Sequence, residues 1–360
     1  MIFDAKVAGR SDVGSVRTNN EDSFVVADPR ERARIDTSSG TRDLVVSGRG
    51  LLLAVSDGMG GAEAGEVASA IVVESLHRTF AKAPLEGDED SIAAFIDTAV
   101  SEANREVIES AKQPGRQGMG ATLTAVLLHA GNAYIAEVGD SRAYVVRGRR
   151  IRQMTKDQSF VQLLIDAGAL SPDDATVSPH KTVILQAMGQ KASVTPAVGR
   201  LALRRGDKLL LCSDGLTNKV EDTEIADIVD AAATLDEACA RLIALANERG
   251  GEDNITAVLA EVEGAALAMF DGQESVTHTY QLVHDYVEVT SSPSSTPRSP
   301  SVPAPAPSSG HDEVNDEGDL LPGVSAGPPG DLKTRPQQMA VAALIIGAML
   351  YVLYTALRDR

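Results

Sequence analysis

The chain has 360 residues and a hydrophobic fraction of 43%, enough for a sizeable core in one large or two small domains. Its formal net charge of −18 argues against nucleic-acid binding, because an acidic surface repels a phosphate backbone. Cys212 and Cys239 form neither a CxxC pair nor a Cys-x5-Arg loop, and the six histidines show no metal-ligand spacing. The composition therefore argues against a zinc site and against a cysteine nucleophile, and it suits reduced core thiols.

The first half of the chain mixes helix and strand signals. Residues 51–55 form an apolar run short enough for a buried strand, and residues 30–50 resemble a polar hairpin insertion. Apolar side chains recur at helical spacing over residues 62–80 and 91–111, which predicts two helices.

The middle of the chain predicts mostly antiparallel strands. A meander is expected over residues 122–129, 132–138, 141–147 and 149–154, with glycine turns between its first and last pairs. A short helix over 160–167, strands over 208–212 and 254–262, and a helix over 235–249 complete the set. Runs of strands with paired helices predict an α+β fold with helices packed outside the sheets, rather than a doubly wound parallel sheet.

The last hundred residues divide into three segments. Residues 263–290 are an extension of uncertain structure, in which 279–289 fits a helix or a strand. Residues 291–336 are rich in Pro, Ser and Gly, which predicts a disordered linker. Residues 339–357 carry no charge and, at about 1.5 Å per residue, come close to the thickness of a bilayer core. We expect a transmembrane helix there; a buried core helix is the alternative, which the preceding linker disfavours.

Five aspartates stand at the ends of apolar, strand-like runs. They are Asp22, Asp57, Asp140, Asp214 and Asp253. Side chains at strand ends can converge at one edge of a sheet, and oxygen ligands without His or Cys suit Mg²⁺ or Mn²⁺. Two such ions about 4 Å apart can deprotonate a water for in-line attack on phosphorus. The aspartates therefore predict a site for two hard metal ions.

Two of these aspartates precede glycine, and Asp-Gly is also a common hairpin turn. A hairpin needs a second strand directly after the turn. Asp57-Gly58 is instead followed by two more glycines and a helix pattern, and Asp214-Gly215 by no alternating strand. The metal interpretation is therefore favoured over the turn at both places.

Arg17 lies in a polar stretch, five residues before Asp22. A guanidinium can bind two phosphate oxygens at once. The alternative is an ordinary solvated surface arginine, and only the surrounding motif argues against it.

Six stretches in order resemble the bacterial form of the protein phosphatase 2C family of metal-dependent serine/threonine phosphatases. They are Asp12-Val13-Gly14 with Arg17 and Asn20-Glu21-Asp22, Ser56-Asp57-Gly58-Met59-Gly60-Gly61 with Gly65-Glu66, Gly118-Met119-Gly120-Ala121-Thr122, Val138-Gly139-Asp140-Ser141-Arg142, Ser213-Asp214-Gly215-Leu216-Thr217, and Gly251-Glu252-Asp253-Asn254-Ile255-Thr256. Together they cover residues 1 to about 262, the expected catalytic domain.

The resemblance implies a sandwich of two antiparallel sheets flanked by pairs of helices, with two or three Mn²⁺ or Mg²⁺ ions as cofactors. Asp57 would bridge two ions. Asp214 and Asp253 would complete the ligands of one, and the Gly58 carbonyl with Asp22 those of the other.

The same resemblance gives the remaining motif residues supporting roles. Asp140 would help Asp214 hold a third, weaker ion, and Arg17 would orient the phosphate. Glu21 and Asn254 would lie just outside the metal ligands, with Glu21 contacting an ion directly or through water. Residues 156–190 resemble the family's mobile segment beside the site, which we call the flap.

Three residues depart from the family pattern. Met59 stands where some members have a histidine proposed as general acid, so water is the expected proton source for the leaving group. Gln158 replaces a histidine common after Asp157, and Asn218 replaces a common acidic residue. These changes could shift the third metal or the flap.

The expected function is hydrolysis of phosphoserine and phosphothreonine in proteins by a metal-bound hydroxide, without a covalent intermediate. The alternative is a catalytically weak module that binds phosphoproteins at a membrane, against which the retained Asp57, Asp214, Asp253 and Arg17 argue. Expected partners are phosphorylated proteins and, by analogy, serine/threonine kinases and their substrates, with a monomeric catalytic domain and no nucleic acid. Residues 1–6 lack the apolar start of a signal peptide, so we expect a cytoplasmic domain anchored by a single C-terminal helix.

Overall fold

The computed structural model describes residues 1–28, 34–60, 64–82, 85 and 88–285. These described residues belong to one compact unit. Within the described part of the chain, no helix is both long enough and apolar enough to cross a bilayer. The predicted linker over 291–336 and the predicted transmembrane helix over 339–357 lie outside the described residues, and both stay predictions.

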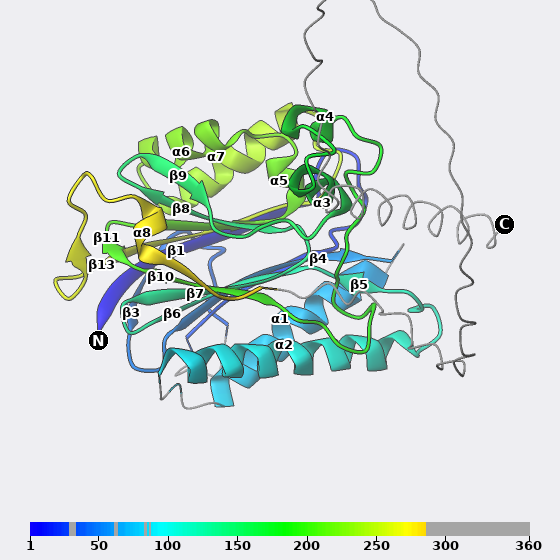
Figure 1. The fold of residues 1–360 in the computed structure, drawn as a ribbon, viewed down its shortest axis with the longest axis horizontal. Coiled ribbons are helices and arrows are strands. Elements are labelled where there is room, and N and C mark those ends of the chain that lie inside the picture. Colours follow the sequence, from blue (N-terminus) through cyan, green and yellow to red (C-terminus); the bar gives the residue numbers. More distant parts are fainter. Residues whose placement is uncertain (29–33, 61–63, 83–84, 86–87, 286–360) are drawn as a thin grey trace, which may run out of the picture. The chain divides into compact units, whose positions relative to one another are not determined.

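Two antiparallel sheets form the centre of the protein (Figure 1). In sheet order, the six-stranded sheet consists of β3 (Arg42–Val46), β1 (Phe3–Asp12), β13 (Ile255–Glu263), β12 (Lys208–Cys212), β8 (Arg142–Arg147) and β9 (Arg150–Gln153). The seven-stranded sheet consists of β15 (Tyr280–His284), β10 (Ala197–Ala202), β7 (Asn132–Val138), β6 (Leu123–His129), β4 (Leu51–Met59) and β2 (Asp22–Ala27), with β5 (Gly120–Ala121) paired to the end of β4. A short parallel pair joins β11 (Arg204–Arg205) to β14 (Ala268–Met269).

Side chains alternate between the two faces of a strand, so each sheet contributes to two apolar layers. One face of both sheets supplies a shared core that includes Val7, Leu53, Val145, Leu209 and Val258. The outer face of the seven-stranded sheet packs against α1 (Ala64–Lys82) and α2 (Glu89–Ala111), and that of the six-stranded sheet against α6 (Asp222–Ala231) and α7 (Leu235–Glu248). The predicted α+β sandwich with paired outer helices is confirmed (Figure 1).

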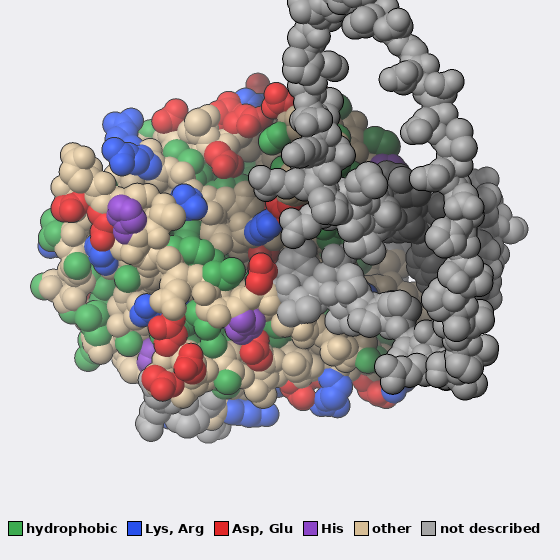
Figure 2. All heavy atoms as spheres, in the orientation of Figure 1, with side chains coloured by type: hydrophobic (Ala, Val, Ile, Leu, Met, Phe, Trp, Pro, Cys, Tyr) green, Lys and Arg blue, Asp and Glu red, His purple; other side chains and the backbone are tan. Residues whose placement is uncertain are grey.

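The described residues also form short helices between the strands: α3 (Phe160–Asp166), α4 (Pro172–Thr176), α5 (Asp214–Thr217) and α8 (Val276–Thr279). In the view of Figure 2, acidic and basic side chains are interspersed with apolar ones over the described surface. The predicted helices over 62–80, 91–111, 160–167 and 235–249 correspond to α1, α2, α3 and α7, within a few residues at each end.

The predicted four-stranded meander is wrong. β6 pairs with β7 in one sheet and β8 pairs with β9 in the other, so β7 and β8 do not pair. The chain crosses between the sheets at Gly139, Asp140 and Ser141, three residues that look like a turn in the sequence. Because Gly139 has φ +108°, it makes a backbone turn that other residues rarely adopt.

The predicted polar hairpin over residues 30–50 is also wrong within the described part of that stretch. Its strand, β3, pairs with β1 from the chain's start rather than with a neighbour inside the stretch. Val46 is buried and Leu44 packs against the core between the sheets, so the segment adds an edge strand.

The extension after residue 262 is built into the domain. Leu267 and Val276 are buried in the shared core, and β15 pairs with β10 as a strand of the larger sheet. The question left open for residues 279–289 is answered for 280–284, which form this strand.

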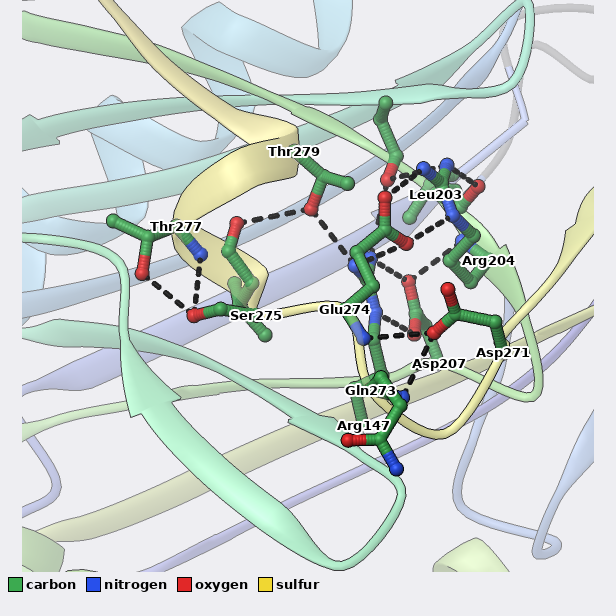
Figure 3. A network of polar contacts seen from close by, with 12 residues as sticks. Arg147, Leu203, Arg204, Asp207, Asp271, Gln273, Glu274, Ser275, Thr277 and Thr279 are labelled. Carbon is green, nitrogen blue, oxygen red and sulfur yellow. Dashed lines mark hydrogen bonds and ion pairs between the residues drawn. The ribbon is translucent and has the colours of Figure 1, made fainter.

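A buried polar network fastens this extension to the body (Figure 3). Arg147 and Asp207 are 2% and 1% exposed and form a two-bond ion pair of 2.6 and 2.7 Å. Arg147 also donates to the Thr279 hydroxyl, and Arg204 forms a second two-bond pair with Glu274.

Candidate metal centre

The strand-end aspartates come together as the sequence predicts, at an end of the sandwich to which both sheets contribute. Asp22 on β2 lies directly opposite Asp57 on β4 in the larger sheet. Asp214 follows β12 and Asp253 precedes β13 in the smaller sheet, and Asp140 lies in the crossover between the sheets.

A cleft of about 640 Å³ opens over these residues. Its lining includes seven of the predicted site residues: Arg17, Glu21, Asp57, Gly58, Asp140, Asp214 and Asp253. Asp22 and Asn254 lie behind this lining; they are 8% and 4% exposed. The flap also lines the cleft, through Thr182, Ile184, Leu185 and Ala187.

Thr122 forms hydrogen bonds with both backbone groups of Asp57. Thr122 is not among the site residues predicted from the sequence. The Asp57 N–H donates to the Thr122 hydroxyl at 2.9 Å, and the Thr122 N–H donates to the Asp57 carbonyl at 2.8 Å. The Thr122 hydroxyl also shares a 2.7 Å hydrogen bond with Ser141, next to Asp140. Thr122 therefore links the segments that carry Asp57 and Asp140.

Asp22 joins the two sheets. Its Oδ2 accepts hydrogen bonds from the hydroxyls of Ser213 and Thr256, at 2.6 and 2.7 Å, and both residues belong to the smaller sheet's side of the site. Its Oδ1 is buried and has no hydrogen-bond partner. A buried carboxylate oxygen without a partner lowers the stability of the fold unless a cation or a hydrogen-bond donor binds it. Ser213 and Thr256 were missed as functional residues because their partner lies 191 and 234 positions away in the chain.

Asn254 fixes the loop that carries Arg17 and Glu21. Its amide oxygen accepts from the Glu21 N–H at 2.7 Å, and its amide nitrogen donates to the carbonyls of Val13 and Asn19. Asn254 therefore holds the backbone around Glu21, and its place just outside the metal ligands stays a prediction.

Arg17 and Asp253 form an ion pair of 3.0 Å at the cleft, and both side chains are substantially exposed. The negative charge of Asp253 raises the pKa of Arg17 above its usual value, so the guanidinium stays charged. In this arrangement Arg17 lies within reach of anything that binds beside Asp253.

Asp214 begins α5 and accepts from the side-chain amide of Asn218 at 3.0 Å, so Asn218 contacts the site although it is not acidic. The other oxygen of Asp214, Oδ1, is buried without a hydrogen-bond partner. Asp214 therefore repeats the pattern of Asp22, with one satisfied and one orphaned oxygen.

Four buried carboxylates of the site, those of Asp22, Asp57, Asp140 and Asp214, resist ionisation. Burial raises the pKa of Asp22 to about 7, although the hydrogen bonds from Ser213 and Thr256 act in the opposite direction. For Asp57, Asp140 and Asp214 the pKa also rises, first because of burial and then because of the negative charge of neighbouring carboxylates. These groups repel one another when charged, and bound cations remove that repulsion.

These properties fit hard divalent ions. The site offers several carboxylates, two orphaned buried oxygens and no His or Cys among the predicted ligands, which is the donor set of Mg²⁺ or Mn²⁺. No three acidic, His or Cys side chains of the described residues are grouped closely enough to hold an ion by themselves. Backbone carbonyls such as that of Gly58, together with water, would therefore have to complete the ligands.

Met59 and Gly60 line the cleft, and none of the described residues in its lining is a histidine. The expectation that water supplies the proton to the leaving group stays a prediction.

Comparisons with known proteins agree with this fold and cleft. A family profile described as protein phosphatase 2C matches residues 40–260. Serine/threonine protein phosphatase PstP of Mycobacterium tuberculosis is 38% identical over 260 residues, which are 71% of this chain and 45% of that protein. Serine/threonine phosphatase stp of Listeria monocytogenes is 35% identical over 253 residues, 70% of this chain and 94% of that protein.

A solved structure gives the same result. The catalytic domain of PstP in complex with two manganese ions matches with a TM-score of 0.60 and 35% identity, covering 73% of this chain and all of that one. The fold, with its acidic cleft, is thus that of metal-dependent serine/threonine phosphatases. The chain belongs to the protein phosphatase 2C family. It spans less than half the length of the M. tuberculosis relative that it matches.

Proposed function

We propose that this chain is a protein serine/threonine phosphatase that hydrolyses phosphoserine and phosphothreonine at a binuclear Mn²⁺ or Mg²⁺ site. The observation that carries the proposal is the convergence of Asp22, Asp57, Asp214 and Asp253 from four strands, with two buried carboxylate oxygens left unpaired. Two divalent ions bound here would activate water and neutralise charge on the phosphoryl group.

Each residue of the proposed site would have its own role in binding metal or phosphate. Asp57, held by Thr122, would bridge the two ions; Asp214 and Asp253 would serve one ion, and Asp22 with the Gly58 carbonyl the other. Asp140 would support a third, weaker ion. Since Asp253 would then share its charge with a metal, Arg17 would be free to bind two phosphate oxygens.

The test is phosphate release from a phosphothreonine peptide by the full chain, with and without Mn²⁺. Asp57→Asn and Asp214→Asn should each lower the manganese-dependent rate by a factor of at least about 100, since both ligands belong to the reacting centre. Asp36→Asn is the matched control, because Asp36 is exposed, does not line this cleft and bonds to Ser38, two residues along the chain. Undiminished activity in the two site variants would sink the proposal.

We also propose that residues 339–357 anchor the enzyme to a membrane, with the catalytic domain in the cytoplasm and phosphoproteins made by serine/threonine kinases as its substrates. The support is the uncharged run of nineteen residues followed by Arg358 and Arg360. Full-length chain should sediment with membranes and residues 1–338 should not. Identical, soluble fractionation of the two would show that the anchor is absent.

A further inference from the structure

The flap is fastened to the body at two places close together, residues 156–158 and 185–186, which we call the flap root. The Leu185 N–H donates to the Gln158 carbonyl at 2.8 Å, and the Phe160 N–H donates to the Val183 carbonyl at 2.8 Å. The two ends of the flap are therefore paired to each other where they leave the domain.

Gln158 lies at the centre of this root and is 0% exposed. Its side-chain Oε1 accepts from the Gly139 N–H and from the Gln186 side chain, both at 3.0 Å. Its Nε2 donates to the Glu137 carbonyl at 3.2 Å, and its own N–H donates to the Gly139 carbonyl at 2.8 Å. One buried amide thus contacts the crossover between the sheets and the returning end of the flap.

The neighbouring residue strengthens the same junction. The Lys156 N–H donates to the buried Glu137 carboxylate at 2.9 Å. Lys156 and Gln158 therefore both fasten this end of the flap to residues 137 and 139. Beyond Gln158, the Gln186 amide also exchanges two hydrogen bonds with the backbone of Thr195.

The crossover leads straight to the metal centre. Asp140 follows Gly139, and Ser141 shares a hydrogen bond with the Thr122 hydroxyl, which accepts from the Asp57 N–H. A displacement of the flap root would be passed through Gly139 to the backbone that carries Asp140.

We propose that Gln158 is a positioning residue that couples the flap to Asp140, so that the flap position and metal binding at Asp140 depend on each other. This rests on the proposed function for the metal, but the coupling itself is a property of the junction. The chemistry requires an amide: the same side chain accepts twice and donates once, which a carboxylate cannot do and a neutral imidazole can do only in part.

The experiment uses three variants of the full chain. Gln158→Leu removes the amide, at the risk of lower stability, because it leaves the buried Gly139 N–H and Glu137 carbonyl unpaired. Gln186→Leu removes the bond to Gln158 together with the two bonds to the Thr195 backbone; Gln186 is half-buried, so the variant should fold. Gln162→Leu is the control: this flap glutamine donates to Asp166 and touches no part of the junction.

Two measurements report on coupling without using catalysis. Calorimetric titration with Mn²⁺ gives the affinity of the weakest site, and hydrogen exchange with and without Mn²⁺ gives the protection of the flap amides. We expect Mn²⁺ to slow exchange at the flap root of the wild-type chain. In Gln186→Leu this extra protection should fall at least threefold and the weakest Mn²⁺ affinity about three- to tenfold, while Gln162→Leu matches the wild type.

The dependence of activity on Mn²⁺ concentration distinguishes lost coupling from an unfolded flap. In Gln186→Leu, kcat/KM for a phosphothreonine peptide should fall at low Mn²⁺ and recover at high Mn²⁺. Wild-type Mn²⁺-dependent protection in both junction variants would overturn the coupling. Metal binding without phosphate release by the wild-type chain would instead overturn the proposed function and leave the coupling to be judged by exchange alone.

Discussion

At the scale of single residues, the site depends on side chains that hold the aspartates as much as on the aspartates themselves. Thr122 pairs with both backbone groups of Asp57 and with Ser141, while Ser213 and Thr256 hold one oxygen of Asp22. If these aspartates bind metal as proposed, such support would keep their geometry fixed when ions bind or leave.

Thr122→Val tests this support, because valine keeps the shape and removes the hydroxyl. The Asp57 N–H would lose its acceptor, at a cost of about 1–3 kcal/mol for a buried unpaired donor. We expect the manganese-dependent kcat to fall about tenfold or more, measured on a phosphopeptide. Thr98→Val on α2, whose hydroxyl bonds only to the Ala94 carbonyl, should behave as wild type. Equal rates for both variants would contradict the role of Thr122.

The raised pKa of Asp22 predicts how the metal-free protein responds to pH. Between the ordinary value of 3.8 and the folded value of about 7, the folded state holds a proton that the unfolded state has released. The free energy of unfolding should therefore decrease as pH rises through this window. Asp22→Asn keeps an acceptor for Ser213 and Thr256 and removes the charge.

In chelator, Asp22→Asn should be more stable than wild type at pH 8, by an amount of the order of 2 kcal/mol, and should lose this advantage near pH 4. Urea unfolding across the pH range measures the difference. A stability difference between wild type and variant that does not change with pH would show that Asp22 ionises normally.

At the scale of elements, the site requires β4 and α1 to approach closely at their glycines. A Cβ on Gly58 would lie 2.0 Å from the Gly65 carbonyl oxygen and 2.8 Å from that of Glu21. Both obstacles are backbone atoms, so they cannot move aside as a side chain would.

Gly58→Ala should therefore push α1 away from β4 and disturb the carbonyl proposed as a metal ligand. We expect a loss of about 2–4 kcal/mol of stability, measured by urea unfolding, and weaker Mn²⁺ binding. Gly48→Ala is the matched control, since its Cβ would meet nothing within 4 Å and its backbone is not left-handed. Similar stability for the two variants would mean that α1 is not held by this contact.

The elements themselves could mostly be predicted from hydrophobic periodicity, but their partners could not. β7 and β8 are two apolar strands separated by Gly139, Asp140 and Ser141, which matches a hairpin as well as it matches a crossing between sheets. Only packing against different helices distinguishes the two. The aspartates were predictable because they end strands, whereas Thr122 and Thr256 resemble ordinary strand residues and acquire their roles from distant partners.

At the scale of the whole molecule, the extension after residue 262 is part of the folded domain. The buried Arg147–Asp207 pair contacts Thr279 and lies near Glu274, and Tyr280 donates to the Met154 carbonyl just before the flap. A chain that ends at residue 262 would expose Arg147 and uncover β10.

We expect residues 1–262 to melt about 10 °C below residues 1–285, because β14, β15, the short helix α8 and the ion pairs of Glu263, Glu274 and His284 are lost. Calorimetry of the two proteins in chelator measures this. The control is residues 1–285 with Arg205→Gln, which loses an exposed ion pair with Glu263. Because exposed ion pairs contribute little to stability, this protein should melt within about 1–2 °C of residues 1–285. Equal melting of all three would show that the extension adds no stability.

The pairing of β1 with β13 sets the order in which the protein can form. Asp4 faces Glu263 and Asp12 faces Ile255, so β1 leaves the ribosome long before the strand with which it pairs. Contacts between such distant segments slow folding and keep apolar edges unpaired during synthesis. Asp253 can join Asp22 and Asp214 only after this closure. A nascent chain would therefore stay inert toward phosphoproteins until its domain is nearly complete, and would depend meanwhile on chaperones to shield β1.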